Sequence, residues 1–344
     1  MDSARYAAPA KMAKRLDDPT SYRWFFFVLL IYACVAYGIG RSDFPALLLQ
    51  YVQTLLTRLP FLLGTVCAIG LLLRLRSESI SDAVAHLRSR AVLLSMMAIA
   101  LLLALTSYTT LKIQIPDLVP FYADEWAARL DMTLHADAPW IWTHAVWPDA
   151  WSETMFFVYG KLWFAYWIAT PVYVVLWCKP GLTRNYIWAF LLTLMICGNV
   201  VALMFSSVGP VYYDHFLGGD TFEGLQARLT ALDQSGSALY YASYLLDSYY
   251  SRDSAFGTGI SAIPSMHVAV AVLNAWLFSQ MNRFAGVLAW GFALLIQFGS
   301  VYTGWHYAID GYMSALLVTL IWAMVMRAHG DRLSVYSKRQ TAPA

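Results

Sequence analysis

Two short stretches near the C-terminal end of the chain carry residue types that could perform phosphoryl-transfer chemistry. The first is Pro264-Ser265-Met266-His267, and the second is the run YTGWHYAID from Tyr302 to Asp310, whose His306 lies 39 positions after His267. Each contains a histidine at the point where a loop gives way to a long apolar run. His306 and Asp310 are four residues apart, so on a helix they would share one face. Two histidines and a carboxylate at one membrane surface favour nucleophilic and acid–base chemistry on a phosphate ester.

The predicted helix starts at these histidines would also offer a place for an anion. We expect Pro264 in the first turn of a helix, where its missing N–H would be unpaired anyway. The amides that follow, including those of Ser265 and His267, would point out of the helix end, where the helix dipole favours negative charge. Asp310 would hold a ring nitrogen of His306 and raise its nucleophilicity. An aspartate at the membrane end of an apolar helix is costly unless it is paired.

The remaining polar candidates have simpler explanations. Four other histidines are expected to be hydrogen-bonded structural groups: His135, His144, His215 and His329. Histidine and aspartate are also metal ligands, and Asp214-His215 could add a further ligand to the two motifs. The motifs have no other clustered ligand, and we therefore expect neither a metal nor another cofactor. The four cysteines fall inside apolar runs and are expected to be buried, unpaired small side chains: Cys34, Cys67, Cys178 and Cys197.

Composition indicates the elements that must position these residues. The 344 residues are 59% hydrophobic and 13% charged, too apolar for an ordinary soluble domain. Runs of roughly 18 or more apolar residues predict transmembrane helices. We expect an all-α, polytopic integral membrane protein with about eight spans, at 23–40, 57–74, 91–110, 154–178, 185–206, 263–281, 284–303 and 306–327.

The distribution of basic residues predicts the orientation of these spans. With both termini inside, 16 of the 23 Lys and Arg residues fall on the cytoplasmic side. Cytoplasmic loops are generally enriched in Lys and Arg. His267 and His306 would then both lie at the outer face of the membrane.

Two long segments lie outside the predicted spans. Residues 111–153 are rich in Trp, Pro and acidic residues, which suits an amphipathic helix in the interface. This segment is either a surface collar without chemistry or a gate for lipid. In residues 207–262, Asp220 and Glu223 resemble a helix start. The spacing of three leucines then predicts one apolar helix face: Leu225, Leu229 and Leu232. A long loop that ends in a Gly-rich approach to His267 is expected to be a lid over the site.

At these motifs the sequence resembles the type 2 phosphatidic acid phosphatase superfamily. That superfamily carries Pro-Ser-Gly-His followed by Ser-Arg-x5-His-x3-Asp at adjacent helix starts. Here Met266 replaces the glycine and Ser300 replaces the arginine. The substituted forms look more like the inositol phosphorylceramide synthase branch and its bacterial relatives, and a Pro-rich pattern between residues 115 and 140 resembles that branch too. In that branch a membrane enzyme transfers a lipid phospho-headgroup to the hydroxyl of another lipid. The resemblance covers roughly residues 110–327 and leaves the first two spans outside a six-helix catalytic core.

The resemblance implies a role for each matching residue. His306 would attack phosphorus and form a phosphohistidine, with Asp310 orienting its ring. His267 would protonate the leaving alcohol and then deprotonate the incoming hydroxyl or water. Ser265 and neighbouring amides would bind phosphate oxygens. Residues on the substrate or lid side are expected to be Gly209, Pro210, Tyr213 and Tyr302.

Both phosphate-binding arginines of the superfamily are missing. Its first motif, Lys-x6-Arg-Pro, is represented only by Gly209-Pro210. Phosphoryl transfer depends mainly on positioning and charge stabilisation, so another cation should replace the arginines. Lys161 is the first candidate, because a lysine inside a span is usually functional, although it could instead snorkel outward or pair with Glu153. Arg252 is the second, and the others are Lys112 and Arg129.

These observations predict a domain plan and an activity. Residues 1–90 should hold a tail and two extra transmembrane helices, 91–330 the catalytic domain, and 331–344 a cytoplasmic tail. We expect phosphoryl or phospho-headgroup transfer from a membrane phospholipid to a lipid or water acceptor, with no nucleic-acid partner. The resemblance places the enzyme in a bacterial inner membrane, with cytoplasmic termini and a periplasmic site. The alternatives are hydrolysis of a lipid phosphate or polyprenyl diphosphate, and, in another class, a lipid transporter or flippase. A transporter should show broken spans in two related halves, and no such repeat is visible.

Overall fold

Helices make up nearly all of the structure, a computed structural model that describes residues 22–74 and 79–330. This part of the chain is 82% helical and contains no strand, which confirms the predicted all-α class. The expected tails, residues 1–21 and 331–344, lie outside the described residues.

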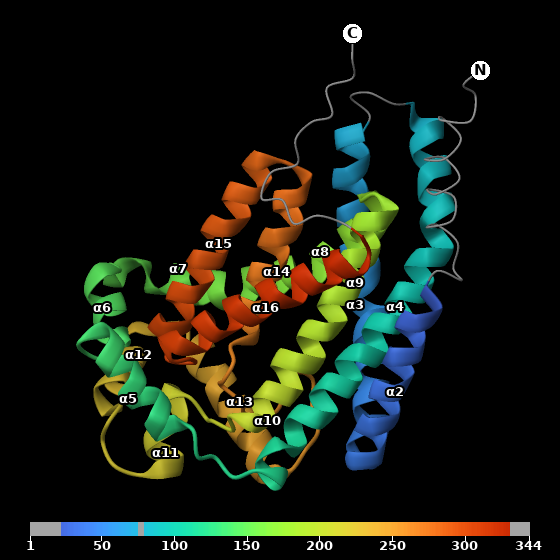
Figure 1. Cartoon of the computed structure of the whole chain (residues 1–344). Helices are drawn as coiled ribbons and strands as arrows, with labels where there is room; N and C mark the ends of the chain where they lie inside the picture. Colours follow the sequence, from blue (N-terminus) through green and yellow to red (C-terminus); the bar gives the residue numbers. More distant parts are fainter. Residues whose placement is uncertain (1–21, 75–78, 331–344) are drawn as a thin grey trace.

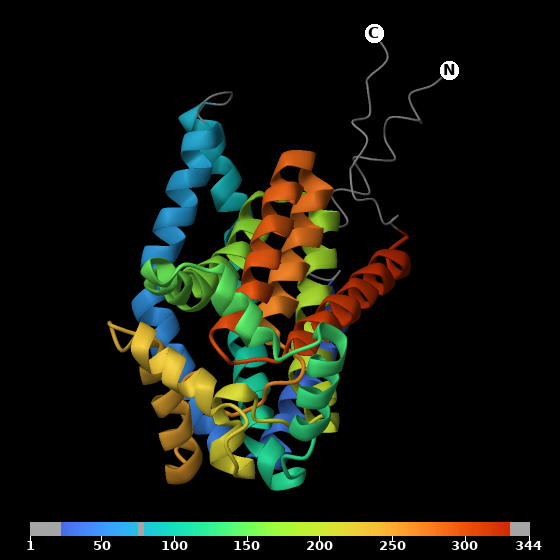
Figure 2. The same ribbon diagram turned by 90° about the vertical axis from the view of Figure 1, so that its left-hand side faces the viewer.

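Long helices form a bundle that carries the shorter helices at one end (Figure 1). The long helices are α2 (Arg23–Ile39), α3 (Asp43–Arg74), α4 (Ile80–Leu118), α8 (Trp163–Trp177), α9 (Pro180–Met195), α14 (Met266–Met281), α15 (Arg283–Tyr302) and α16 (Ala308–Ala328). The shorter ones are α5 (Asp124–His135), α6 (Pro139–Val146), α7 (Ser152–Phe156), α10 (Ala202–Met204), α11 (Tyr213–Leu217), α12 (Glu223–Leu232) and α13 (Ser237–Ser251). α14 and α15 stand side by side as an antiparallel hairpin, and α16 is inclined away from them (Figure 2).

Four helical segments are long and apolar enough to cross a membrane among the described residues. They are Val84–Leu118, Pro180–Met204, Arg283–Tyr302 and Ala308–Ala328, and two shorter apolar helices accompany them, Arg23–Ile39 and Met266–Met281. Hydrophobic helices of this length are what a bilayer requires. The chain is therefore compatible with a membrane protein, and most predicted spans coincide with one of these helices to within a few residues.

The segment 111–153 differs from the single interfacial helix that its composition predicts. Its first eight residues are the end of α4, which continues to Leu118 although Pro116 lies inside it. Two separate helices follow, α5 and α6, which end at an αL residue, Ala136, and before the extended Trp147. Pro139 starts α6 and Pro148 follows its end, so the segment is a series of short helices rather than one continuous amphipathic face.

Two π-helical turns interrupt the helical runs 152–177 and 180–204. One spans Phe157–Leu162 between α7 and α8, and the other spans Ile196–Val201 between α9 and α10. Such turns rotate the side chains on either side relative to a regular helix and are frequent at functional sites. The first of them bears directly on His267, as described below.

The segment 207–262 contributes much of a second apolar cluster at one end of the bundle. Leu225, Leu229 and Leu232 of α12 are buried in it, as their spacing predicts. The start of the helix differs from the prediction, because the carboxylate of Asp214, rather than that of Asp220, accepts a hydrogen bond from the amide of Phe222. After α13, residues 252–265 form an extended strap that leads to α14.

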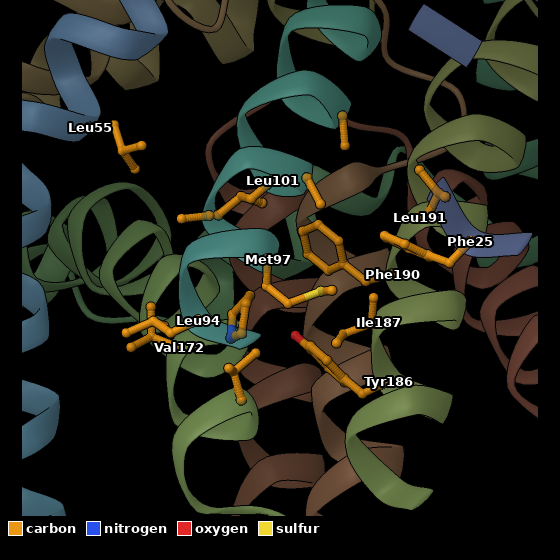
Figure 3. A pocket seen from close by; sticks show the side chains of 15 residues that line it. Phe25, Leu55, Leu94, Met97, Leu101, Val172, Tyr186, Ile187, Phe190 and Leu191 are labelled. Atoms are coloured by element: carbon orange, nitrogen blue, oxygen red, sulfur yellow. The ribbon is translucent and has the colours of Figure 1, made fainter. Parts of the chain in front are cut away.

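An apolar pocket lies inside the bundle, between α4 and α9, with contributions from α2, α3 and α8 (Figure 3). The residues that line it include Phe25, Leu55, Met97, Val172, Tyr186 and Phe190. Neither His267 nor His306 lines this pocket. It is therefore separate from the site that the sequence motifs predict.

Candidate active site

His267 lies in the first turn of α14. The helix starts at Met266, and the Oγ of Ser265 accepts a hydrogen bond of 3.4 Å from the amide of Val268. Pro264 therefore precedes the helix instead of occupying its first turn, which corrects the prediction. The physical reason is that Ser265 is a better N-cap than proline, since its hydroxyl satisfies a free amide of the first turn.

The ring of His267 is held between two aromatic side chains of the segment that contains the first π-turn. Tyr159 stacks on it with 4.4 Å between ring centroids and a 15° angle, and Trp163 lies 3.8 Å away. The Nε1 of Trp163 also donates a 2.9 Å hydrogen bond to the carbonyl of His267. Sequence reasoning missed Tyr159 and Trp163, although an aromatic pair four residues apart on a helix shares one face and could have indicated them.

His306 faces His267, with 6.1 Å between the two ring centroids. It lies in the turn between α15 and α16, two residues before Ala308, the first residue of α16. This corrects the expectation that His306 begins the helix. His306 and Asp310 nevertheless come together, because the turn brings Nδ1 of His306 to 3.3 Å from Oδ2 of Asp310.

The protonation of His306 follows from its surroundings. Its Nδ1 lies 2.8 Å from the main-chain carbonyl of Ala262. A carbonyl can only accept, so Nδ1 carries the hydrogen and Nε2 keeps the free lone pair. The side chain is only 8% exposed. Burial lowers the pKa of His306 to about 3, although the hydrogen bond to Ala262 raises it; the nearby charge of Lys112 lowers it further. The ring is neutral at physiological pH, as a nucleophile must be.

Asp310 is fully buried beside this histidine. Its Oδ2 also accepts a 3.0 Å hydrogen bond from the amide of Tyr307, which fixes the start of α16. Its Oδ1 has no hydrogen-bond partner among residues 22–74 and 79–330. The carboxylate is thus oriented by the helix start and positioned to stabilise a positive charge on His306.

Two further buried aspartates of α5 support the site, and sequence reasoning missed both. The carboxylate of Asp131 accepts hydrogen bonds from the amides of Ala308 (2.6 Å) and Ile309 (3.0 Å) and so caps α16. Burial raises the pKa of Asp131 against the lowering effect of these bonds. Negative charge at a helix N-terminus stabilises the helix.

Asp124 holds the loop that replaces the first motif of the superfamily. Its carboxylate accepts hydrogen bonds from Ser207 Oγ (2.8 Å), from the amide of Gly209 (2.9 Å) and from Tyr307 Oη (3.0 Å). The amide of Val208 donates to it as well. The acidic run Asp124-Glu125 in an interfacial segment was the available sequence signal, since a buried carboxylate needs partners.

The predicted phosphate-binding residues are not all brought to the histidines. Ser265 is adjacent to His267, but its buried hydroxyl caps α14. Lys161 lies in the first π-turn with an exposed side chain, within electrostatic reach of Glu153. Arg252 is 77% exposed and pairs with Asp117 at 3.3 Å. Arg129 is 71% exposed and pairs with Glu125. Lys112 of α4, in contrast, interacts electrostatically with both His267 and His306.

The residues predicted on the substrate or lid side have mainly packing roles. Gly209 has a positive φ of 84°, and Pro210 begins a short 3₁₀ turn, Pro210–Tyr212. The ring of Tyr213 packs on Phe222. Tyr302 is buried, with its hydroxyl 2.7 Å from Ser152 Oγ and its ring stacked on His144.

The four histidines expected to be structural are hydrogen-bonded, and so is His86, to the carbonyl of Leu176. The partners are Tyr312 for His135, the carbonyl of Tyr302 for His144, Tyr250 for His215 and Asn185 for His329. The structure shows no group of three or more His, Cys, Asp or Glu that could hold a metal ion, within the residues it describes. All four cysteines are unpaired, and Cys178 and Cys197 are buried as expected. Cys34 is exposed and Cys67 is partly exposed, which corrects the expectation for these two, because an apolar helix can leave one face uncovered by the rest of the chain.

A small pocket adjoins the site where α5 and α6 approach the start of α16. His306 and Tyr307 line it together with residues of α5, α6 and the external segment, including Asp131, Trp140, Pro210 and Phe222. The arrangement therefore combines a neutral imidazole with a free Nε2, a second imidazole facing it, and a carboxylate behind the first. These are the groups that covalent phosphoryl transfer requires.

Comparison with known proteins supports this assignment. No curated protein and no solved structure matches the chain significantly. A model of the PAP2 superfamily matches residues 125–324, which include His267, His306 and Asp310. Members of that superfamily are phosphatases or phosphotransferases. The chain belongs to the PAP2 superfamily and is an enzyme of this kind.

Proposed function

We propose that this chain is a membrane-embedded lipid phosphotransferase that works through a phosphohistidine on His306. The observation that carries the proposal is the facing pair of imidazoles, 6.1 Å apart, with Asp310 behind His306 at 3.3 Å. At that separation both rings can act on the same phosphorus centre. The substrate class, a phosphorylated membrane lipid, follows from superfamily membership and from the apolar helices that carry the site.

In the first step, Nε2 of His306 attacks phosphorus and the bond from phosphorus to the leaving oxygen breaks. When the negatively charged phosphate is bound beside it, His267 holds a proton; it gives this proton to the leaving oxygen, so the leaving group departs as a neutral alcohol. Asp310 and the Ala262 carbonyl stabilise the positive charge that develops on the ring of His306. The product is a phosphohistidine and a neutral His267.

In the second step, neutral His267 removes the proton of an incoming hydroxyl, whose oxygen attacks phosphorus. The bond between phosphorus and Nε2 breaks, and both histidines return to their starting protonation. The incoming group is a lipid hydroxyl in transfer and water in hydrolysis. The two reactions thus share every residue and differ only in what reaches the site.

Exclusion of water favours transfer over hydrolysis. His306 is 7% exposed, and the rings of Tyr159 and Trp163 pack against the partly exposed ring of His267. Leu225 and Leu229 of α12 pack directly against the turn at Gly304. A dry site lets a bound alcohol compete with water for the phosphorylated intermediate. We place the chain with the inositol phosphorylceramide synthase branch on this basis, together with the missing arginines, and hydrolysis is the second candidate.

The proposal includes a membrane arrangement. We infer about eight spans, a six-helix catalytic core within residues 91–330, and two additional helices before it. The orientation predicted from the basic residues puts both histidines at the outer face, with cytoplasmic termini, in a bacterial inner membrane. Segment 207–262 would then act as a lid, and segment 111–153 as a collar through which lipid enters.

The direct test is incubation of the purified full chain with labelled phospholipids and polyprenyl phosphates. Each donor is offered with and without ceramide or diacylglycerol as acceptor. A new phospholipid that forms only when an acceptor is present supports transfer. Release of free phosphate or of a soluble phospho-headgroup at a rate that the acceptor does not change would show that the enzyme is a hydrolase and not a transferase. If none of the donors is turned over, the proposed activity on these lipid classes is wrong.

The phosphohistidine is tested with the variant His306→Ala. We expect it to lose turnover and the acid-labile phosphoenzyme while remaining folded, because the nucleophile has no substitute. His215→Ala is the matched control, since His215 is exposed and bonds only to the hydroxyl of Tyr250 in the structure. Full activity of His306→Ala would exclude this mechanism.

A further inference from the structure

The site lacks the cations that would normally hold a phosphate. The buried carboxylates near it, Asp124, Asp131 and Asp310, add negative charge and are engaged by amides. A phosphoryl group brought to His306 would therefore find only acidic side chains and main-chain groups beside it unless a cation faces it. Phosphoryl transfer relies on such charge stabilisation.

Three of the four candidate cations are unsuited to this task in the structure. Arg252 and Arg129 are largely exposed and pair with acidic neighbours, Asp117 and Glu125. Lys161 is exposed at the first π-turn and lies near Glu153. An exposed, solvated cation contributes little to a charge inside a dry site.

Lys112 has the opposite surroundings. It lies near the end of α4, is partly buried, and interacts electrostatically with both His267 and His306. Its ammonium group has no hydrogen bond or ion pair with any residue that the structure describes. A partly buried ammonium without a counter-charge, on a helix long and apolar enough to cross a membrane, is costly and favours a role in binding an anionic substrate.

The strap of residues 252–265 contacts both Lys112 and His306. At Gly259, φ is 97°, and a Cβ there would lie 3.1 Å from Cγ of Lys112 and 3.2 Å from its main-chain carbon. Three residues later, the carbonyl of Ala262 bonds to His306. Glycine at 259 thus lets the strap lie directly against α4 while it contacts the nucleophile.

We propose that the ammonium group of Lys112 binds the non-bridging oxygens of the phosphoryl group held between His267 and His306. It replaces the arginines that are absent at Ser300 and before Pro210. This inference rests on the proposed function, which it deepens. It also means that α4, whose lysine lies outside the matched residues 125–324, supplies part of the active site.

The test compares Lys112→Met with Lys112→Arg in the purified full chain. Loss of one transition-state donor typically lowers kcat by about 10²–10³-fold, and we expect that loss for Lys112→Met. We expect KM for the lipid to change by less than about threefold, since the interaction acts on the transition state. Lys112→Arg keeps the charge and should retain activity to within about tenfold. Lys161→Met, which removes an exposed lysine, is the matched control and should equal the wild type.

A second measurement is independent of turnover. Inorganic orthovanadate should raise the thermal denaturation temperature of the wild type and of Lys112→Arg, but not that of Lys112→Met. If Lys112→Met does not fold, Lys112→Gln is compared in the same way. Equal vanadate stabilisation of the wild type and the neutral variant, or none in either, overturns the proposal. If the wild type binds vanadate through Lys112 but turns over no lipid, the proposed function fails while the assignment of Lys112 stands.

Discussion

Two hydrogen-bond acceptors lie close to Nδ1 of His306, and each has a different effect on the ring. The carbonyl of Ala262 lies 2.8 Å from Nδ1 and Asp310 lies 3.3 Å away. The carbonyl selects the tautomer, and the carboxylate supplies the negative charge that an imidazolium needs. Asp310 alone is predictable from the sequence, because a spacing of four residues is visible in a sequence and a main-chain carbonyl 44 positions away is not.

The low pKa of His306 predicts how stability responds to acid. Its ordinary value is 6.5 and burial lowers it to about 3, so at pH 5 the unfolded chain binds a proton that the folded chain does not. Stability is therefore complete above the ordinary pKa and falls as the pH drops towards 3. Between pH 7 and pH 5 the loss should be about 2 kcal/mol. Thermal denaturation in detergent should show a smaller acid-induced fall for His306→Gln than for the wild type.

His215→Gln serves as the control for this experiment, because its ring is exposed. That variant should follow the wild type at both pH values. An identical fall for the wild type and His306→Gln would show that His306 is not the group whose titration destabilises the fold.

Residue-scale prediction from the sequence succeeds where chemistry depends on local spacing. The two histidines and Asp310 are found in this way, and the structure brings them together. Asp124 and Asp131 are missed because each acts on main-chain or side-chain groups 83 to 183 positions away. The sequence does not separate Lys112 from Lys161, since both lie in or beside apolar runs, and only the folded chain shows which one is near the histidines.

At the scale of elements, the site depends on how closely two loops approach each other. Loop 207–210 packs against the turn that carries Trp305 and His306, and the amide of Val211 donates to the carbonyl of Gly304 at 2.8 Å. Gly209 permits this contact, since a Cβ on it would lie 2.6 Å from the carbonyl oxygen of Trp305. The alternation of loops and helices is predictable from apolar runs, whereas this close approach depends on tertiary packing.

Replacement of Gly209 by alanine should therefore disturb the site. The backbone conformation alone, with a φ of 84° and a ψ of 166°, costs about 1–3 kcal/mol for alanine. The clash with a main-chain oxygen adds roughly 1–3 kcal/mol, because backbone cannot rotate away. We expect a lower denaturation temperature and reduced turnover for Gly209→Ala. Gly218→Ala separates the two effects, since Gly218 has a φ of 79° and a Cβ added there would meet no atom within 4 Å.

The control variant should show only the conformational cost and keep its activity. Equal stability and equal activity in the two variants would mean that the contact between Gly209 and Trp305 does not position His306.

At the scale of the whole molecule, the bundle separates its connections into two groups. In Figure 1 the turn between α14 and α15 and the turn between α8 and α9 lie towards the top. The short helices α5, α11, α12 and α13 lie at the lower left and bottom. The distribution of Lys and Arg predicts the same grouping, because it reflects a physical rule of membrane insertion. The exact ends of the helices depend on capping groups such as Ser265 and Asp131, which the apolar runs do not reveal.

The orientation can be tested with single cysteines in a variant that lacks the four native ones. Asp220 and Lys179 are both exposed and lie in the two different groups of connections. A membrane-impermeant maleimide should label Asp220→Cys in intact cells and Lys179→Cys only after the membranes are broken. The reverse pattern would put the histidines at the cytoplasmic face.

The hydrogen bond from His306 to Ala262 has a consequence for how this enzyme can change over generations. The group that selects the nucleophilic nitrogen belongs to the peptide backbone, so every amino acid at position 262 carries it. No codon change at that position removes the carbonyl, and selection there acts only on the small space left for the side chain, 2% exposed in the structure. The choice of tautomer is therefore inherited with the path of the chain rather than with the identity of a residue.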